Sequence, residues 1–318
     1  MCSDEENPRD VFRWVLRWFA YPIQHPGAKL KTALVIHGPQ GVGKNLFTEA
    51  VMAIYGEYGR IVGQAEIEER FNDWASRKLF LIANEVVARA ELFHQKNKLK
   101  ALITDDWIRI NPKNVAAHDE RNHMNLVFLS NEVQPVVVEP GDRRFAVIWT
   151  PKKREQAFYQ AVLDEIRNGG IAALHHYLLN VDLGDFHPGT PPPETRARRR
   201  LIEISKESPD RFADEWLAGE LDAPVHACAL ADLYEVYVRW IRKNGERFPY
   251  PLNKFSARLQ TREDVQIVKK PALIGAKTRV LRAVLPEDDC TPDGTWSRWL
   301  GERVEAFRRA IEESRDDF

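Results

Sequence analysis

The stretch that decides the fold is Val35-Ile36-His37-Gly38-Pro39-Gln40-Gly41-Val42-Gly43-Lys44-Asn45. It reads as the end of an apolar strand, a glycine-rich turn and the start of a helix, which is the GxxxxGK pattern of a phosphate-binding loop. Glycines let the backbone N–H groups of such a loop turn inward around an anion, and the positive end of the following helix points at the same anion. The pattern therefore predicts a nucleotide site on an α/β fold.

Lys44 is the residue that we expect to reach the β- and γ-phosphates of the nucleotide. The other phosphate-binding residues predicted from the pattern are Gly38, Pro39, Gln40, Gly41, Val42, Gly43, Asn45 and Leu46. Asn45 stands where the pattern usually has Ser or Thr, and an amide oxygen is a weaker Mg²⁺ ligand. The alternative is an ordinary strand–turn–helix corner, but the apolar run before the loop and the helical run over residues 46–55 favour the nucleotide site.

Composition limits the other possibilities. The chain has 318 residues, about right for two domains, and a net charge of −1, so any nucleic-acid surface must be local. Cys2, Cys228 and Cys290 are far apart and odd in number, which suits a reducing cytosol better than a disulfide framework. No apolar run approaches the length of a membrane span, so we expect no membrane association.

A second apolar run follows the loop at residues 79–83 and ends in Asn84-Glu85. A buried parallel strand reads as a continuous apolar run, and its carboxyl end faces the ligand crevice. Glu85 is therefore the candidate catalytic base that polarises the attacking water. Asn84 takes the position of the usual metal-side Asp, so the predicted magnesium ligands are Asn45, Asn84 and Glu85. The alternative is a core strand with a capping acid.

Two further segments carry candidate catalytic residues. An apolar strand at residues 125–129 ends in Ser130-Asn131, and Asn131 is placed to hold the attacking water; a turn-forming Asn is the alternative. Arg143 and Arg144 lie in a polar turn before the apolar residues 145–149. Paired arginines can stabilise phosphoryl-transfer charge in cis or from a neighbouring subunit, and a solvated turn is the alternative.

The segment between these two strands offers candidate DNA contacts. We expect residues 107–111 and 125–129 to pair as antiparallel strands, with residues 112–121 at the tip. The candidate DNA-binding residues are Lys113, Asn114, His118 and Arg121. Their charges can meet a phosphate backbone, and a solvated surface hairpin is the alternative.

The predicted organisation has five parts: an N-terminal helical segment at 1–30 with Asp10 as N-cap, a P-loop core with a helical lid at 31–181, a Pro/Arg-rich linker at 182–204, a winged-helix-like α+β domain at 205–286, and a tail with a helix at 287–318. In the winged-helix-like domain, the helix at residues 251–262 is expected to expose Lys254, Arg258 and Arg262 to DNA. The strands at 265–270 and 278–285 form the wing.

Four segments together resemble the ordered motifs of superfamily 3 helicases, and most of all the helicase portion of phage and plasmid primase-helicases. Walker A matches residues 38–45, Walker B residues 79–85, motif B′ residues 100–113 and motif C residues 128–131. The phrases that carry the likeness are HPGAKLKTALVIHGPQGVGKN, LKALITDDWIRINPKN, VFLSN and GDRRFAV. The resemblance covers residues 10 to 220 and is strong through residue 150.

The resemblance implies an AAA+-type core, a ring that is usually a hexamer, ATP with Mg²⁺, and 3′-to-5′ movement on single-stranded DNA in a bacterial host cytoplasm. In this resemblance Lys44 binds phosphate and Asn45 binds the metal. Glu85 is the acidic residue that activates water, and Asn131 is the sensor. Arg143 or Arg144 becomes the finger that reaches the next subunit. A primase or polymerase acting in trans is also implied, since no primase signature is visible here.

Two classes of function stay open at this point. The leading hypothesis is an ATP-driven DNA helicase or translocase that replicates a phage or plasmid-type mobile element. The alternative is a nucleotide-dependent AAA+ assembly or loader module, which the weak metal ligands favour. The lysine-tipped hairpin favours the helicase. A small-molecule kinase on a P-loop core fits the sensor Asn and the paired arginines less well.

Overall fold

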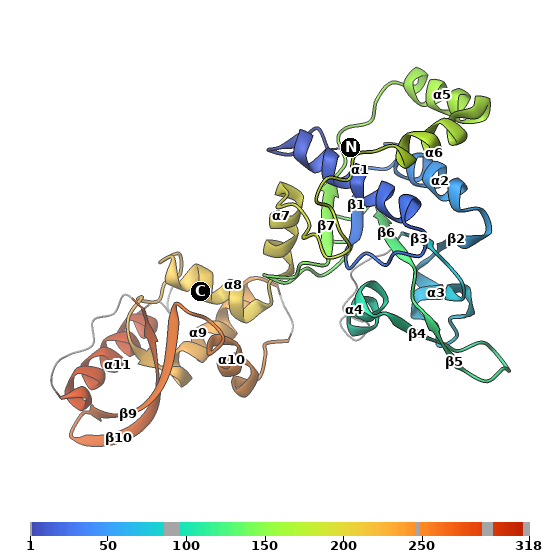
Figure 1. Ribbon diagram of the computed structural model, residues 1–318. Coiled ribbons are helices and arrows are strands. Elements are labelled where there is room, and N and C mark those ends of the chain that lie inside the picture. Colours follow the sequence, from blue (N-terminus) through green and yellow to red (C-terminus); the bar gives the residue numbers. More distant parts are fainter. Residues whose placement is uncertain (1, 86–95, 246–247, 288–294, 314–318) are drawn as a thin grey trace. The chain divides into compact units, whose positions relative to one another are not determined.

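The computed structural model describes residues 2–85, 96–245, 248–287 and 295–313 (Figure 1). The chain divides into two compact units, Met1–Ser205 and Lys206–Phe318. Within the described ranges, no helix combines the length and apolarity that a membrane span requires.

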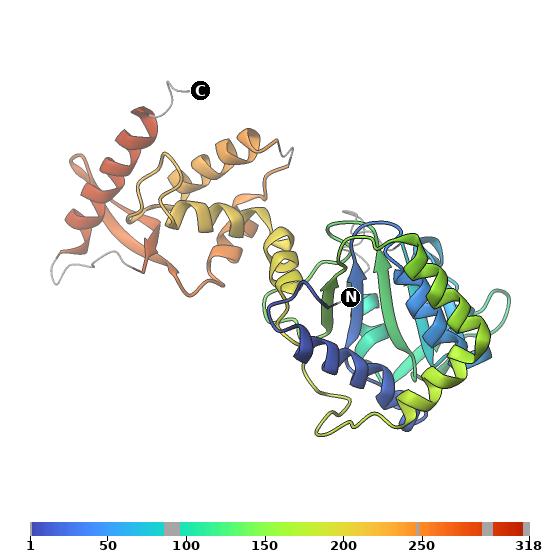
Figure 2. The same ribbon diagram turned by 90° about the horizontal axis from the view of Figure 1, so that it is seen from above.

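A five-stranded parallel sheet forms the centre of unit 1, in the order β2-β3-β6-β1-β7 (Figure 2). Its strands are β1 (Ala33–His37), β2 (Gly59–Val62), β3 (Phe80–Asn84), β6 (Asn125–Ser130) and β7 (Phe145–Trp149). Because all neighbours are parallel, the carboxyl ends of β1, β3 and β6 lie at one edge of the sheet. That edge is where ligands bind in open α/β sheets.

Helices cover both faces of this sheet, which is why its strands are continuously apolar. The helices of unit 1 are α1 (Pro8–Gln24), α2 (Lys44–Tyr55), α3 (Gln64–Glu68), α4 (Lys96–Thr104), α5 (Gln156–Glu165), α6 (Ile171–Leu179) and α7 (Arg196–Ser205), with short helical turns at Gly56–Tyr58, Asp73–Ala75 and Ile166–Gly170. Leu34 and Ile36 of β1 pack with α1, α2 and α6, whereas Ala33 and Val35 face α3, α4 and α7. Alternate residues of one strand thus serve two cores.

The first helix starts earlier than predicted. It begins at Pro8, with Asn7 as N-cap, whereas Asp10 was predicted as the cap. Proline is favoured in the first helical turn because its missing N–H has no intrahelical acceptor there. Asp10 instead lies in the first turn, where its carboxylate complements the helix dipole and pairs with Arg13 at 3.3 Å.

Residues 182–204, predicted as a linker, pack on unit 1 up to its boundary at Ser205. Phe186 is buried and stacks edge-on against Trp14 at 5.7 Å. The indole of Trp14 donates to the carbonyl of Pro191 at 2.9 Å, and the Thr195 hydroxyl donates to the carbonyl of Val147 at 2.6 Å. The prolines and glycines shape turns here, but the apolar and hydroxyl side chains between them fix the segment to the core.

The hairpin of unit 1 differs from the prediction. The strand β4 (Trp107–Ile110) pairs antiparallel with β5 (His118–Arg121), while residues 125–130 form β6 of the parallel sheet. The predicted pairing was wrong because β6 is buried along its whole length, as a central strand must be, whereas β5 is short and polar. Two exposed cross-strand contacts join β4 to β5: Arg109 with Asp119 at 3.4 Å, and Arg121 over the ring of Trp107 at 4.8 Å.

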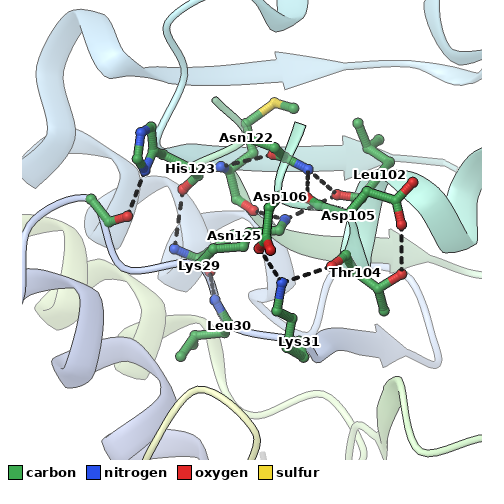
Figure 3. Close-up of polar contacts among 12 residues, drawn as sticks. Lys29, Leu30, Lys31, Leu102, Thr104, Asp105, Asp106, Asn122, His123 and Asn125 are labelled. Carbon is green, nitrogen blue, oxygen red and sulfur yellow. Dashed lines mark hydrogen bonds and ion pairs between the residues drawn. The ribbon is translucent and has the colours of Figure 1, made fainter. Parts of the chain in front are cut away.

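A polar cluster joins the lead-in to β1 with the foot of this hairpin (Figure 3). Lys29 donates to the carbonyls of Leu102, at 2.9 Å, and of Met124. Lys31 donates to the carbonyl of Thr104 at 2.8 Å and pairs with the carboxylate of Asp106. These lysines satisfy carbonyls at the end of α4 that have no partner within the helix.

Two asparagines complete the cluster (Figure 3). The amide of Asn122 donates to the carbonyls of Leu102 at 3.0 Å and Asp105 at 2.9 Å. Asn125, the first residue of β6, accepts from the N–H of Leu30 at 2.9 Å and donates to the carbonyl of Ala28 at 3.0 Å. These hydrogen bonds therefore connect the segment before β1, the end of α4 and the start of β6, next to the ends of β4 and β5.

Unit 2 is a small α+β unit. It contains α8 (Ser208–Leu217), β8 (Cys228–Ala229), α9 (Leu230–Lys243), α10 (Leu252–Leu259), β9 (Val265–Ile274), β10 (Lys277–Pro286) and α11 (Trp296–Glu313), with a sheet in the order β8-β10-β9. The three helices α8 to α10 share a core that includes Phe212, Tyr237 and Phe255. The predicted class, a parallel α/β core followed by a small α+β unit, is confirmed; β8 is an addition.

The last helix packs closely on the sheet of unit 2. Leu300 and Val304 of α11 pack on Ala272 and Ala283 of the hairpin. A Cβ at Gly301 would lie 1.9 Å from the carbonyl oxygen of Leu273, so only glycine allows this approach.

The first prediction concerns Lys29. Burial, and to a smaller extent the positive charge of Lys31, lower the pKa of this lysine from its ordinary 10.5 to about 7. Because the unfolded chain then binds more protons than the folded chain, stability rises with pH between about 7 and 10.5, by at most about 1.4 kcal/mol per pH unit. Lys29→Met removes this group and nothing else that titrates.

The measurement is the difference in unfolding free energy between the parent and Lys29→Met at pH 6 and pH 9. We expect the parent to gain on the variant as the pH rises, since other titrating groups cancel in the difference. A difference that stays constant over this range contradicts the depressed pKa.

Candidate nucleotide site

The glycine-rich loop of residues 38–43, predicted to bind phosphate, leaves β1 and enters α2 at Lys44. Gly38 has φ +137°, and a Cβ there would lie 2.3 Å from the hydroxyl of Thr150. Gly43 has φ +87°, and a Cβ there would lie 3.1 Å from the ring of Tyr159. Both positions therefore require glycine, for backbone conformation and for space. Pro39, Gln40 and Gly41 form the exposed tip of the loop.

Lys44 is buried, and its ammonium lies inside the loop. It donates to the carbonyls of Gly38 at 2.8 Å and Pro39 at 2.9 Å, and to the side-chain oxygen of Asn131 at 2.9 Å. Burial lowers the pKa of Lys44, because desolvation disfavours the charged form. A bound anion would relieve this penalty and replace neutral acceptors with charged ones. Asn131, the predicted sensor, is thus in direct contact with Lys44, the residue predicted to bind phosphate.

The carboxyl end of β3 faces the same place. The amide of Asn45 donates to the side-chain oxygen of Asn84 at 3.3 Å, so the two unusual asparagines lie together. Glu85 is exposed and has φ +55°, a conformation that costs a non-glycine residue about 1 kcal/mol or more. An open cleft of ≈ 640 Å³ is lined by Asn84, Glu85, Ser130, Asn131 and Glu132, together with Ile61, Gly63, Gln64 and Glu66.

Magnesium fits this donor set only with help from phosphate. The described residues contain no cluster of three or more His, Cys, Asp or Glu side chains that would hold a metal alone. Mg²⁺ usually keeps several waters and binds through one or two protein groups plus substrate phosphates. The amide oxygen of Asn45 and the carboxylate of Glu85 meet that requirement, whereas the oxygen of Asn84 already accepts a hydrogen bond.

An apolar pocket of ≈ 570 Å³ lies beside the loop, formed by α1, α2, α5 and α6. Val42, Gly43 and Leu46 contribute the wall next to the loop, and Phe158 and Tyr159 contribute aromatic rings from α5. The wall is mostly apolar, with Lys152, Arg154 and Glu165 as its charged members. Its size and lining suit a planar purine base.

Arg143 and Arg144 lie at the amino ends of the parallel strands, opposite to the carboxyl ends that carry the loop. The N–H of Ala33, the first residue of β1, donates to the carbonyl of Arg144 at 2.7 Å. The five residues of β1 separate this edge from the loop by about 13 Å, so neither arginine reaches the P-loop of its own subunit. Arg144 pairs with the buried carboxylate of Asp142 at 3.2 Å, whereas Arg143 is exposed.

Three residues after β7 lie at the site although the sequence did not predict them there. Thr150 closes the loop from behind, since its backbone N–H donates to the carbonyl of His37 at 2.8 Å. The ammonium of Lys153 would lie 3.6 Å from a Cβ on Gly41, so this cation stands beside the phosphate loop. Tyr159 packs on Gly43 and accepts from the N–H of Arg154 at 2.9 Å. A basic run directly after a predicted strand was the available signal.

The four candidate DNA residues separate into two groups. Lys113 and Asn114 lie in the connection between β4 and β5, where Asn114 has φ +61°. His118 and Arg121 instead lie on β5: His118 hydrogen-bonds with Glu120 at 2.8 Å, and Arg121 covers one face of Trp107. Trp107, which the sequence did not single out, is 56% exposed, and an exposed indole of this kind can stack on nucleic-acid bases.

Comparisons with known proteins relate parts of this chain to a family model and to a phage protein. A family model described as "Family of unknown function (DUF5906)" matches residues 36–144, which include the loop, β3, the hairpin, Asn131 and the Arg143–Arg144 pair. A "DNA Primase-polymerase" of Nitratiruptor phage NrS-1 is 35% identical over 136 residues. That match covers 42% of this chain and 19% of the relative, so this chain corresponds to a minor part of the phage protein.

Solved structures extend the likeness over both units. Two apo structures of the NrS-1 C-terminal region match with TM-scores of 0.62 and 0.60, at 21% and 20% sequence identity. Each match covers 86% of this chain and 71% of the solved chain. At this level of identity, the likeness shows a shared fold.

The second prediction separates binding from hydrolysis. Lys44→Ala removes the buried ammonium from the loop, so it should weaken ATP binding and abolish hydrolysis. Glu85→Gln keeps shape but removes the base, so ATP should bind normally while turnover falls about 10²- to 10⁴-fold. Binding is measured by calorimetry, turnover by phosphate release, and Glu49→Gln on the exposed face of α2 is the matched control. Normal turnover in Glu85→Gln would assign the base to another residue.

Proposed function

We propose that this chain is an ATP-driven DNA translocase or helicase module of a phage replication protein. The observation that carries the proposal is the contact of Lys44 with Asn131, because Asn131 follows the strand that starts at the foot of the hairpin. Similarity to a phage primase-polymerase supports a role in phage replication. The chain spans about a fifth of that relative, so its polymerase activity is not transferred.

In this proposal the triphosphate lies in the loop and the base lies in the apolar pocket. Lys44 exchanges its carbonyl acceptors for phosphate oxygens, and Lys153 adds positive charge beside Gly41. Asn45 and Glu85 would hold Mg²⁺ from the protein side. The ion would supply positive charge that offsets the negative charge of the phosphates.

Glu85 accepts a proton from the attacking water, and Asn131 orients that water against the terminal phosphate. Both side chains line the same open cleft, which leaves room for the water. Since Asn131 also holds Lys44, loss of the terminal phosphate changes the hydrogen bonds of both residues together. β6 then carries the change to Asn125 and the cluster below the hairpin.

The proposal includes a ring of subunits, and the position of Arg143 supports it. Arg143 is exposed and lies at the end of the sheet opposite to its own loop, where it is available to the site of a neighbouring subunit. Arg144 holds the buried Asp142 and has a structural role.

A second candidate is a nucleotide-dependent loader that does not unwind DNA. The hydrogen bond between Asn45 and Asn84 favours it, because it occupies the position where a metal-side carboxylate would stand. The two candidates differ in a simple measurement: single-stranded DNA accelerates ATP hydrolysis by a translocase, and it leaves hydrolysis by a loader slow.

The third prediction tests the arginines. Rings mixed from Arg143→Ala and Lys44→Ala subunits contain some interfaces with both an intact loop and an intact arginine, so part of the ATPase activity should return. Arg144→Ala should instead lower the unfolding midpoint, because the buried Asp142 loses its nearer cation and keeps only Lys100 at 3.8 Å. No recovery in intact Arg143→Ala/Lys44→Ala rings would exclude a role in trans.

The fourth prediction tests the hairpin. Lys113→Ala should leave basal ATP hydrolysis unchanged and lower both DNA stimulation and strand unwinding, since Lys113 offers charge to a phosphate backbone. The slope of the logarithm of the single-strand binding constant against the logarithm of salt concentration should become shallower by about 0.7 for one lost phosphate contact. Arg167→Ala, an exposed cation outside the hairpin, is the control. Unwinding that survives Lys113→Ala unchanged would favour the loader.

A further inference from the structure

The β9–β10 hairpin of unit 2 has an unusual charge. Between residues 265 and 286 it contains five cations and no Asp or Glu, in a chain with 46 basic and 47 acidic residues. The five are Lys269, Lys270, Lys277, Arg279 and Arg282. Glu305 of α11 reaches the turn of this hairpin, but its carboxylate accepts from the N–H of Gly275 at 2.7 Å.

Two of these cations oppose each other on the sheet. Lys269 and Arg282 are directly opposite residues of the antiparallel pair, so their side chains share one face, and both are exposed. Like charges at such positions are destabilising. Arg282 donates to the hydroxyl of Ser256 on α10, and among the described residues no carboxylate forms an ion pair with either cation. An external anion would relieve this repulsion.

The arginines of α10 and of the turn after it are already engaged, contrary to the sequence expectation. Arg258 pairs with Asp210 at 2.7 Å and with Glu207 at 3.5 Å. Arg262 pairs with Asp214 at 2.8 Å and with Asp264. Of the three cations predicted on this segment, Lys254 alone stays exposed. Within the part of unit 2 that the structure describes, the hairpin cations therefore form no ion pair with a carboxylate, in contrast to Arg258 and Arg262.

The shape and composition of the hairpin favour duplex over single-stranded DNA. Proteins that bind single strands stack bases on aromatic side chains, and residues 265–286 contain no Phe, Tyr or Trp. A two-stranded β-ribbon fits the major groove of B-DNA, and flanking cations contact its phosphates. We propose that the β9–β10 hairpin binds double-stranded DNA through its phosphate backbone, with Lys269 and Arg282 as the central contacts. This site is distinct from the nucleotide-coupled hairpin of unit 1.

The test uses the full chain without nucleotide and a blunt 20-base-pair duplex, with fluorescence anisotropy at several salt concentrations. The variant is Lys269→Ala with Arg282→Ala. Its matched control is Arg60→Ala with Arg167→Ala, which removes two exposed cations of unit 1. Single-strand binding and the midpoint of thermal unfolding are measured on the same samples.

We expect the variant to bind duplex about tenfold more weakly, with a salt dependence flatter by about 1.8 units for two lost contacts. Its single-strand binding should be unchanged, and its unfolding midpoint should be equal or higher, because a like-charge pair is gone. The control should bind as the parent does. These results would separate the hairpin from the DNA site of unit 1, whatever the fate of the proposed ATPase function.

Three outcomes would overturn the proposal. Duplex affinity equal to the parent would remove the hairpin from DNA binding. An equal loss of single-strand and duplex binding would mean that the cations act on any nucleic acid. Binding of poly-glutamate, weakened by the variant, with no binding of duplex would mark the surface as a site for an acidic protein.

Discussion

The ammonium of Lys44 is the charge on which the arrangement of unit 1 depends. It is buried, so its charge must be compensated by oxygen atoms placed around it: two carbonyls of the loop and the side chain of Asn131. The two carbonyls require a loop that turns tightly, which explains the glycines at positions 38 and 43. The third oxygen requires β6 to lie beside β1, as the parallel register of the sheet provides.

The same strand order gives the site a connection to the hairpin. β6 starts at Asn125, which is held by the lead-in to β1, and it ends at the residue before Asn131. β6 pairs with β1 and β3 and is buried along its whole length, so both of its ends are fixed to the same sheet. Hydrogen bonds at both of its ends thus make β6 a candidate for transmitting the nucleotide state to β4 and β5.

The features that a local sequence pattern determines were predicted correctly. The loop follows from its glycines, and the strands follow from continuous apolar runs, which only a doubly covered sheet can bury. The predicted partner of β4 was wrong because β5, with the sequence His-Asp-Glu-Arg, has no apolar pattern typical of a strand. The apolar residues 125–129 could pair either with β4 or within the parallel sheet, and the sequence alone does not distinguish the two. The engagement of Arg258 and Arg262 by four acids, and the position of Thr150 behind Gly38, depend on tertiary contacts that no local pattern records.

The most direct test of the account is the affinity of the full chain for single-stranded DNA with no nucleotide, with ADP and with a non-hydrolysable ATP analogue. If Lys44, Asn131 and β6 couple the site to the hairpin, these affinities differ by about fivefold or more, and DNA shifts nucleotide affinity by the same factor. Lys44→Ala would then bind DNA equally in all three conditions. Affinities for DNA that are identical in the parent protein, with nucleotide binding demonstrated, would contradict the coupling.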